Sequence, residues 1–221
     1  MVKNPPTSGA VVTPAQGEPL LVRTLSAEEL RSLMALGQRF GCRYAVSLGR
    51  RTFLSRQAPL LHRKTDGGSD TKTYFWRYYM YPLHARTVAS WTDYLARPNA
   101  KAEKVICTCP DVRTDLKFRG LAEADGRFTA TGSNQAAEIT ARGVSKGSAL
   151  GLLAEKLGIP RTAIMAFGND DNDLAMQPFV GRFVAARISS PAALAAADEV
   201  ADSIPAAALR LCLGKEGGKR A

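Results

Sequence analysis

Histidine and cysteine are scarce in this sequence, and their spacing argues against a zinc protein. Only two histidines and four cysteines occur among the 221 residues. The one close pair is Cys107-Thr108-Cys109, with no second pair and no histidine beside it. A structural zinc site needs four such ligands at short spacings. We therefore expect reduced thiols, as is usual in cytoplasmic proteins.

Long apolar stretches are also missing. No hydrophobic run approaches the length of a membrane span, and residues 1–9 contain no apolar segment of a secretory leader. The hydrophobic fraction of 45% is that of a folded globular protein, with enough chain for one large domain or two small ones. We expect no membrane association and a cytoplasmic location.

Acidic residues are few in the first half of the chain. Residues 1–120 carry 19 Lys and Arg against 9 Asp and Glu, so this half holds the whole net charge of +10. A basic surface attracts polyanions, including nucleic acid. The arginines are dispersed, however, and no nucleic-acid-binding signature accompanies them. A small phosphorylated metabolite is therefore the favoured partner, and nucleic acid is disfavoured.

Residues 142–176 hold most of the functional information. Leucines at helical spacing predict a helix that begins near Lys146 and ends at Gly158, with Pro160 following. Residues 163–167 are a short apolar run, which predicts a strand buried on both faces. The chain then becomes acidic in the turn 168–173. Ligands of parallel α/β sheets collect at the carboxyl ends of the strands, so we expect a site in this turn.

The turn 168–173 contains Asp170, Asp171 and Asp173, which repel one another unless a positive charge lies among them. Lys146 is one candidate for that charge. Mg²⁺ is the other, because it prefers carboxylate, carbonyl and water oxygens together with substrate phosphates. In the simpler alternative, the acidic turn only caps the following helix.

Two motifs carry a resemblance to a known family. Residues 143–147 (Gly-Val-Ser-Lys-Gly) and 167–176 (Phe-Gly-Asn-Asp-Asp-Asn-Asp-Leu-Ala-Met) resemble the third and fourth motifs of the haloacid dehalogenase-like (HAD) phosphatases, best in the Cof-type or type IIB branch. The resemblance spans about residues 133–203. Within it, residues 184–186 and 197–200 look like the last core strand and helix. It implies an α/β fold: an incomplete Rossmann-like HAD core with a parallel sheet and an inserted α+β cap domain.

The resemblance also implies a domain organisation. Residues 1–13 would hold the core strand that precedes the cap, residues 14–132 a basic α+β cap, and residues 133–213 the carboxyl-terminal part of the core. Residues 214–221 would be a disordered tail. Inside the cap, Ser26 and Glu29 predict a capping box at a helix start. The aromatic cluster at residues 74–81 is expected mainly to pack the cap.

The family's chemistry is phosphoryl transfer through an aspartyl-phosphate, assisted by Mg²⁺. By resemblance, Lys146 and Asp173 are the catalytic residues, and Lys146 with Asn172 binds the substrate. The implied metal ligands are Asn169, Asp170 and Asp173.

The sequence departs from the family pattern in two ways. Asn169 stands where the family most often has Asp, which should weaken a metal site. The nucleophilic Asp-x-Asp of the first core strand is absent, because no Asp precedes Asp66 and the only Asp-x-Asp is Asp171-Asn172-Asp173. We expect a truncated and inactive chain of a Mg²⁺-dependent phosphatase that acts on a small phosphorylated metabolite such as a sugar phosphate. The alternative is a catalytically dead HAD-like protein that binds an anionic ligand or partner.

Overall fold

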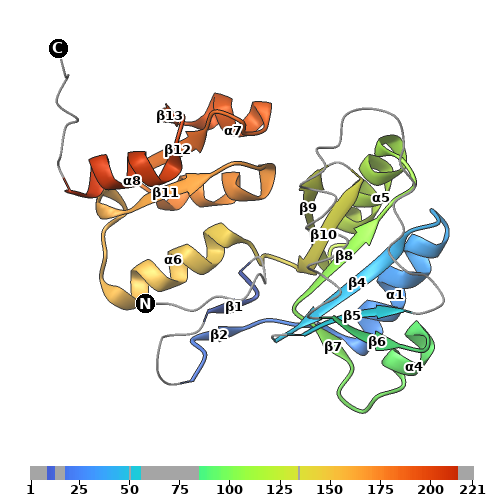
Figure 1. Cartoon of the computed structure of the whole chain (residues 1–221). Helices are drawn as coiled ribbons and strands as arrows, with labels where there is room; N and C mark the ends of the chain where they lie inside the picture. The colour runs from blue at the N-terminus through green and yellow to red at the C-terminus, as the bar shows by residue number, and fades with distance from the viewer. Residues whose placement is uncertain (1–8, 13–17, 50, 56–84, 134, 214–221) are drawn as a thin grey trace. The chain divides into compact units, whose positions relative to one another are not determined.

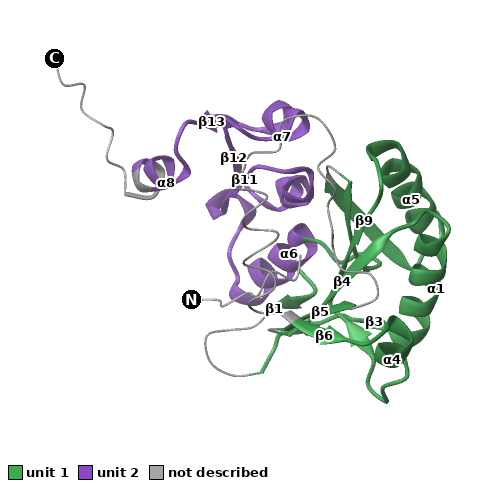
Figure 2. Cartoon of the chain, turned by 45° about the vertical axis from the view of Figure 1, so that its right-hand side comes forward, with its two compact units in different colours: residues 1–145 green, residues 146–221 purple. Residues whose placement is uncertain are grey.

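The computed structural model describes residues 9–12, 18–49, 51–55, 85–133 and 135–213. These residues fall into two compact units, Met1–Ser145 and Lys146–Ala221 (Figure 2). The aromatic cluster at 74–81 and the tail at 214–221 lie outside the described residues. None of the described helices combines the length and apolarity needed to cross a bilayer.

The first unit is built on a six-stranded sheet with the order β6-β5-β4-β8-β10-β9. Its strands are β4 (Arg43–Leu48), β5 (Arg51–Ser55), β6 (Ala85–Val88), β8 (Lys104–Thr108), β9 (Phe128–Ser133) and β10 (Ala136–Ala141). All neighbours are antiparallel except β5 and β6. Two-stranded pairs accompany it: β1 (Val11–Val12) with β2 (Leu21–Val22), and β3 (Leu25–Ser26) with β7 (Lys101–Ala102).

Helices α1 (Ala27–Gln38) and α5 (Val112–Ala124) cover one face of this sheet, with the short helix α4 (Trp91–Leu95) beside them (Figure 1). Alternate strand residues point to this face, as the period of a strand requires. Val46, Val105 and Ile139 from the sheet form one buried cluster with Leu33 of α1 and Phe118 of α5. The unit is therefore an α+β layer pair with its own hydrophobic core.

Helix α1 begins with the capping box that the sequence predicts. The backbone N–H of Glu29 donates to Ser26 Oγ over 3.2 Å, and the backbone N–H of Ser26 donates to Glu29 Oε2 over 2.7 Å. Each partner thereby satisfies a donor that the first helical turn leaves open.

Replacing the cap residue should destabilise the first unit measurably. We expect Ser26→Ala to lower the free energy of unfolding by about 1 kcal/mol, because the N–H of Glu29 loses its acceptor. Ser26→Gly is the matched control, since glycine at this position costs only a few tenths of a kcal/mol. Urea unfolding followed by circular dichroism distinguishes the two variants. Equal losses for alanine and glycine would mean that the box does not stabilise α1.

The second unit contains a three-stranded parallel sheet with the order β11-β12-β13. Its elements are α6 (Lys146–Leu157), the 3₁₀ turn η2 (Arg161–Ala163), β11 (Met165–Gly168), the 3₁₀ helix η3 (Asp171–Phe179), β12 (Arg182–Ala186), α7 (Pro191–Ala196), β13 (Glu199–Ala201) and α8 (Ile204–Leu213). Ala166 of β11 packs in a cluster with Leu150 of α6, and Phe167 packs in a second cluster with Ala207 of α8. Strand β11 is thus covered on both faces, as its apolar sequence predicts.

The predicted helix start and stop also agree with the structure. Helix α6 runs from Lys146 to Leu157, and Gly158 follows with a φ of 64°, a conformation that favours glycine. One detail differs: Leu157, expected on the apolar face, is 60% exposed.

Three segments have strand pairings that the sequence did not predict. Residues 136–141, assigned to the core, form β10 and pair with β8 and β9, and the division between the units follows Ser145 instead of residue 132. Residues 11–12, expected as a core strand, form β1 and pair antiparallel with β2. Residues 199–201 form strand β13, whereas the resemblance placed a helix there. In this segment Asp198 Oδ2 accepts a 2.7 Å hydrogen bond from the N–H of Phe183, which aligns β13 beside β12.

Candidate active site

The acidic turn 168–173 follows directly from the carboxyl end of β11, and glycine makes its shape possible. A Cβ on Gly168 would lie 2.6 Å from Cβ of Asp173 and 2.8 Å from the ring of Phe183. Both contacts are closer than real side chains tolerate. Because residue 168 is glycine, Asp173 can fold back against the strand end.

A reciprocal capping box fixes the turn. Asp170 is the N-cap of η3 and its carboxylate accepts from the first turn of that helix, with Oδ1 receiving the N–H of Asp171 over 2.9 Å. In return, Asp173 Oδ2 accepts the backbone N–H groups of Asn169 and Asp170 over 2.9 and 3.2 Å. The acidic turn therefore does cap the next helix, as the simpler interpretation holds.

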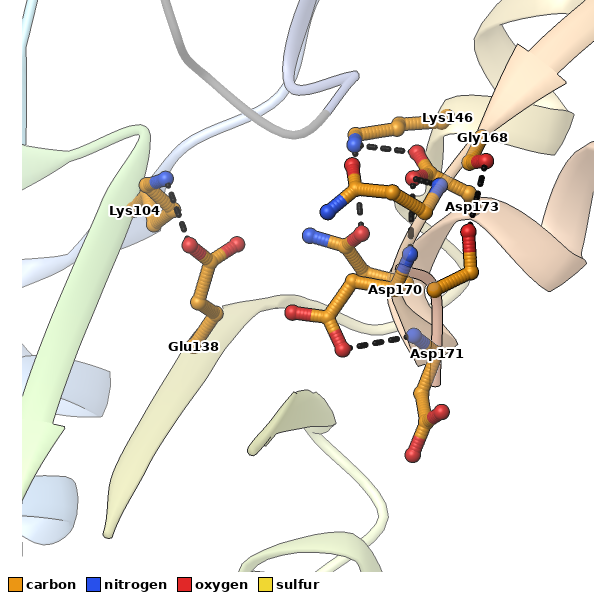
Figure 3. A network of polar contacts seen from close by, with 10 residues as sticks. Lys104, Glu138, Lys146, Gly168, Asp170, Asp171 and Asp173 are labelled. Carbon is orange, nitrogen blue, oxygen red and sulfur yellow. Dashed lines mark hydrogen bonds and ion pairs between the residues drawn. The ribbon is translucent and has the colours of Figure 1, made fainter. Parts of the chain in front are cut away.

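Lys146 lies at the same turn, within its own unit (Figure 3). Its Nζ donates to Asn172 Oδ1 over 3.1 Å and forms an ion pair with Asp173 Oδ1. The side chain of Asp173 is almost fully buried, whereas that of Lys146 is 37% exposed. The ammonium group thus neutralises a buried carboxylate on one side and still reaches solvent on the other.

Close backbone packing brings α6 to this position. A Cβ on Gly147 would lie far inside the contact distance of the carbonyl oxygen of Ala175, and one on Gly151 would clash with the ring of Phe179. Both glycines face η3, so the first two turns of α6 rest on the helix that carries Asn172 and Asp173. This role of Gly147 was not predicted; the only sign of it in the sequence is a glycine directly after the lysine.

Residues outside the predicted set also hold the turn. Ser190 Oγ donates to Asp171 Oδ1 over 2.6 Å, and the N–H of Ser190 donates to the carbonyl oxygen of Asn169 over 2.9 Å. Ser190 is also the N-cap of α7, with Pro191 at the first helical position. The Ser-Pro pair was the sequence signal for this cap.

The predicted site residues therefore gather in one turn, though not in equal roles. Lys146, Asn172 and Asp173 form a connected cluster. Asn169 and Asp170 lie in the same turn, where Asn169 is exposed and contributes its main-chain groups to the hydrogen bonds.

The donor atoms of the turn fit a magnesium ion shared with a phosphate. Amide and carboxylate oxygens are suitable ligands, and Mg²⁺ usually takes only one or two protein carboxylates beside phosphate and water. Among the described residues, no three His, Cys, Asp or Glu side chains come together to hold a metal by themselves. Both oxygens of Asp173 already accept hydrogen bonds, from Lys146 and from the backbone of the turn.

The first unit holds a separate, partly buried ion pair. Lys104 Nζ of β8 lies 3.1 Å from Glu138 Oε1 of β10 (Figure 3). Their neighbours Val105 and Ile139 pack against α1 and α5, so strand alternation puts Lys104 and Glu138 on the other face of the sheet. Neither residue is among the predicted site residues. Because Lys104 is buried, loss of Glu138 would leave an uncompensated buried charge, which is costly.

Comparisons with known proteins agree on one fold. The sequence profile of a family described as haloacid dehalogenase-like hydrolase matches residues 6–209. No curated protein sequence matches the chain. A haloacid dehalogenase-like hydrolase from B. subtilis superposes with a TM-score of 0.72 at 17% identity, over 87% of this chain and 72% of that one.

Two further solved structures are similar. A HAD subclass IIB sugar phosphatase gives a TM-score of 0.70 at 16% identity, over 93% of this chain and 74% of that one. A haloacid dehalogenase-like hydrolase from Bacteroides thetaiotaomicron gives a TM-score of 0.61 at 19% identity, over 88% of this chain and 70% of that one. At such identities the likeness concerns the fold.

Proposed function

Because this chain belongs to the haloacid dehalogenase-like hydrolase family, we propose that it carries the phosphate-binding part of a phosphatase for a small phosphorylated metabolite, such as a sugar phosphate. The observation that carries the proposal is the convergence of the Lys146 ammonium with Asn172 and Asp173 at the carboxyl end of β11. A half-exposed cation in a fixed position is suited to bind a phosphoryl oxygen.

Each residue of the cluster has a distinct task in this proposal. Lys146 binds the phosphoryl group, and Asn172 orients the ammonium by accepting its hydrogen bond. Asp173 holds Lys146 in place and balances its charge while no phosphate is bound. This division keeps the ammonium aimed at one point, which lowers the cost of reorganisation when the anion arrives.

We propose Asn169 and Asp170 as the protein ligands of Mg²⁺. Their amide and carboxylate oxygens would hold the ion together with oxygens of the phosphate, while Asp173 is engaged with Lys146. When bound, Mg²⁺ neutralises charge on the phosphoryl oxygens. Asn169 supplies no charge, so affinity for the ion should depend on the phosphate being present.

The nucleophile is the missing part. Family chemistry requires an aspartate that attacks phosphorus, with a second aspartate two residues later as general acid and base. The only Asp-x-Asp of the sequence is Asp171-Asn172-Asp173, and the carboxylate of Asp173 is buried and occupied by the turn. We therefore propose that these 221 residues alone do not hydrolyse phosphomonoesters.

Anion binding tests the proposed role of Lys146. We expect orthovanadate with Mg²⁺ to raise the melting temperature of the chain by several degrees, and Mg²⁺ alone to have little effect. Lys146→Met should abolish the shift, because the ammonium that meets the anion is gone. The matched control is Lys156→Met, at the exposed end of the same helix. A shift that survives Lys146→Met would overturn the assignment.

A phosphatase assay with Mg²⁺ and a panel of sugar phosphates tests the inactivity. We expect no turnover by the 221-residue chain. Turnover that Lys146→Met abolishes would refute the inactivity and keep the reaction class. Turnover without dependence on Lys146 would contradict both.

A second candidate function follows from the same missing nucleophile: a catalytically inactive protein that binds an anionic ligand or partner. The coding sequence upstream of Met1 discriminates between the two. An in-frame Asp-x-Asp-Gly-Thr segment there supports the enzyme, and its absence supports the binding protein.

A further inference from the structure

Two cysteines that are distant in the sequence meet in the core of the first unit. Cys42 Sγ and Cys109 Sγ lie 3.1 Å apart, and both residues are buried. Cys42 immediately precedes β4, and Cys109 immediately follows β8. Because Arg43 pairs with Thr108 in this antiparallel ladder, Cys42 and Cys109 occupy the next opposed positions.

The backbone at these two positions suits a cross-strand bridge. The N–H of Cys42 donates to the carbonyl oxygen of Gly37 over 3.0 Å, and the N–H of Cys109 donates to that of Gln135 over 2.8 Å. The two cysteines therefore do not donate to each other, which is the arrangement of a non-hydrogen-bonded pair. Opposed residues of that type have Cα atoms about 4.5 Å apart, inside the range that disulfides span.

The neighbouring thiol of Cys107 is placed differently. Cys107 opposes Tyr44 across the ladder, so no cysteine faces it. Cys107 lies in β8 and Cys109 directly follows that strand, so the extended backbone sets the separation of their side chains. The structure thus selects Cys42 with Cys109 over the Cys107-Thr108-Cys109 pair that stands out in the sequence.

We propose that Cys42 and Cys109 form a reversible dithiol–disulfide pair that cross-links the start of β4 to the end of β8. The oxidant is a small-molecule disulfide. A thiolate of the pair attacks the oxidant and releases one thiol, and the second cysteine then attacks the mixed disulfide and releases the other. One S–S bond forms in the protein, and the two thiol protons and two electrons pass to the oxidant, whose own S–S bond breaks.

The surroundings make the exchange slow and selective. The contact with Cys42, and then burial, raise the pKa of the Cys109 thiol, and burial raises the pKa of the Cys107 thiol. Little thiolate of Cys109 is therefore available at neutral pH, and both cysteines of the pair are buried, so brief exposure to an oxidant should leave them reduced. The bridge would form on prolonged equilibration, or during folding.

The bridge should stabilise the first unit. It would close a loop between residues 67 positions apart in the sequence. A cross-link over a loop of this length restricts the unfolded chain, and we expect the melting temperature to rise by about 5–10 °C.

Peptide mapping after equilibration tests the proposal. The full chain is incubated with excess oxidised dithiothreitol, and a second sample is unfolded and refolded in the same buffer so that burial cannot prevent reaction. We expect one linked peptide pair, Cys42 with Cys109, in both samples, and the loss of the bridge on reduction. Cys107→Ala should keep the linkage and the rise in melting temperature, whereas Cys42→Ala should lose both.

Three outcomes would overturn the proposal. The refolded sample could remain reduced at Cys42 and Cys109, or it could link Cys107 instead. The linked form could also melt below the reduced form, which would mean that the bridge strains the native sheet. If a variant fails to fold, peptide mapping and melting of the wild-type chain in its two redox states still show whether the bridge forms and whether it stabilises the protein.

Discussion

Gly147→Ala is expected to lower the free energy of unfolding of the second unit by about 3 kcal/mol. The added Cβ would lie far inside the contact distance of the carbonyl oxygen of Ala175, and 3.1 Å from the backbone nitrogen of Met176. These atoms are main chain and cannot rotate away as a flexible side chain could, so α6 and η3 must move apart. Overpacking of this kind outweighs the gain of up to about 1 kcal/mol that alanine brings to a helix.

The matched control is Gly120→Ala in α5, where a Cβ meets no atom within 4 Å. This variant should gain roughly 0.5–1 kcal/mol from helix propensity alone. Urea unfolding of both variants gives the comparison, and orthovanadate binding by Gly147→Ala should fall as well, since Lys146 moves with α6. Equal and favourable changes in both variants would show that α6 does not depend on the close approach.

Asp173→Ala is expected to cost about 2–3 kcal/mol of stability and to abolish orthovanadate binding. The substitution removes the acceptor of the Lys146 ammonium and of the backbone N–H groups of Asn169 and Asp170. Breaking a buried pair typically costs about 3–5 kcal/mol, but Lys146 is 37% exposed, so water can solvate part of the released charge. The binding loss follows because the lysine is no longer held.

Asp171→Asn provides the control in the same turn. Asp171 is exposed, and an asparagine oxygen can still accept from Ser190 Oγ, so stability should change by less than about 0.5 kcal/mol. Denaturation and titration with orthovanadate, run on both variants, separate a general effect of charge from the specific role of Asp173. Anion binding retained by Asp173→Ala would mean that Lys146 does not need its partner.

Local signals predicted the helix, the strand and the acidic turn around the site. The stop at Gly158, the apolar run before the turn and the Ser26 capping box are properties of a few consecutive residues, and the structure confirms them. The resemblance to the haloacid dehalogenase-like family is confirmed by the family match, and the α/β class with a parallel sheet is confirmed as well. Short motifs are enough here because one helix and the next strand bring the lysine and the acidic turn together.

Long-range pairing was not predictable in the same way. Residues 136–141 were expected in the core, and only their pairing with β8 and β9 places them in the six-stranded sheet. The meeting of Cys42 with Cys109 depends on the register of two strands joined by a long connection. Likewise, the approach of Gly147 to Ala175 is a property of the folded backbone. None of these distances can be deduced from the spacing of the residues along the sequence.

The turn after β11 keeps its shape through main-chain amides. Asn169 offers its N–H to Asp173 and its carbonyl oxygen to the N–H of Ser190, while the residue itself is exposed. The identity of its side chain is therefore uncoupled from the architecture of the loop. An exchange of amide for carboxylate at position 169 can therefore change the charge that the turn presents to a ligand, while the main-chain hydrogen bonds of the turn stay the same.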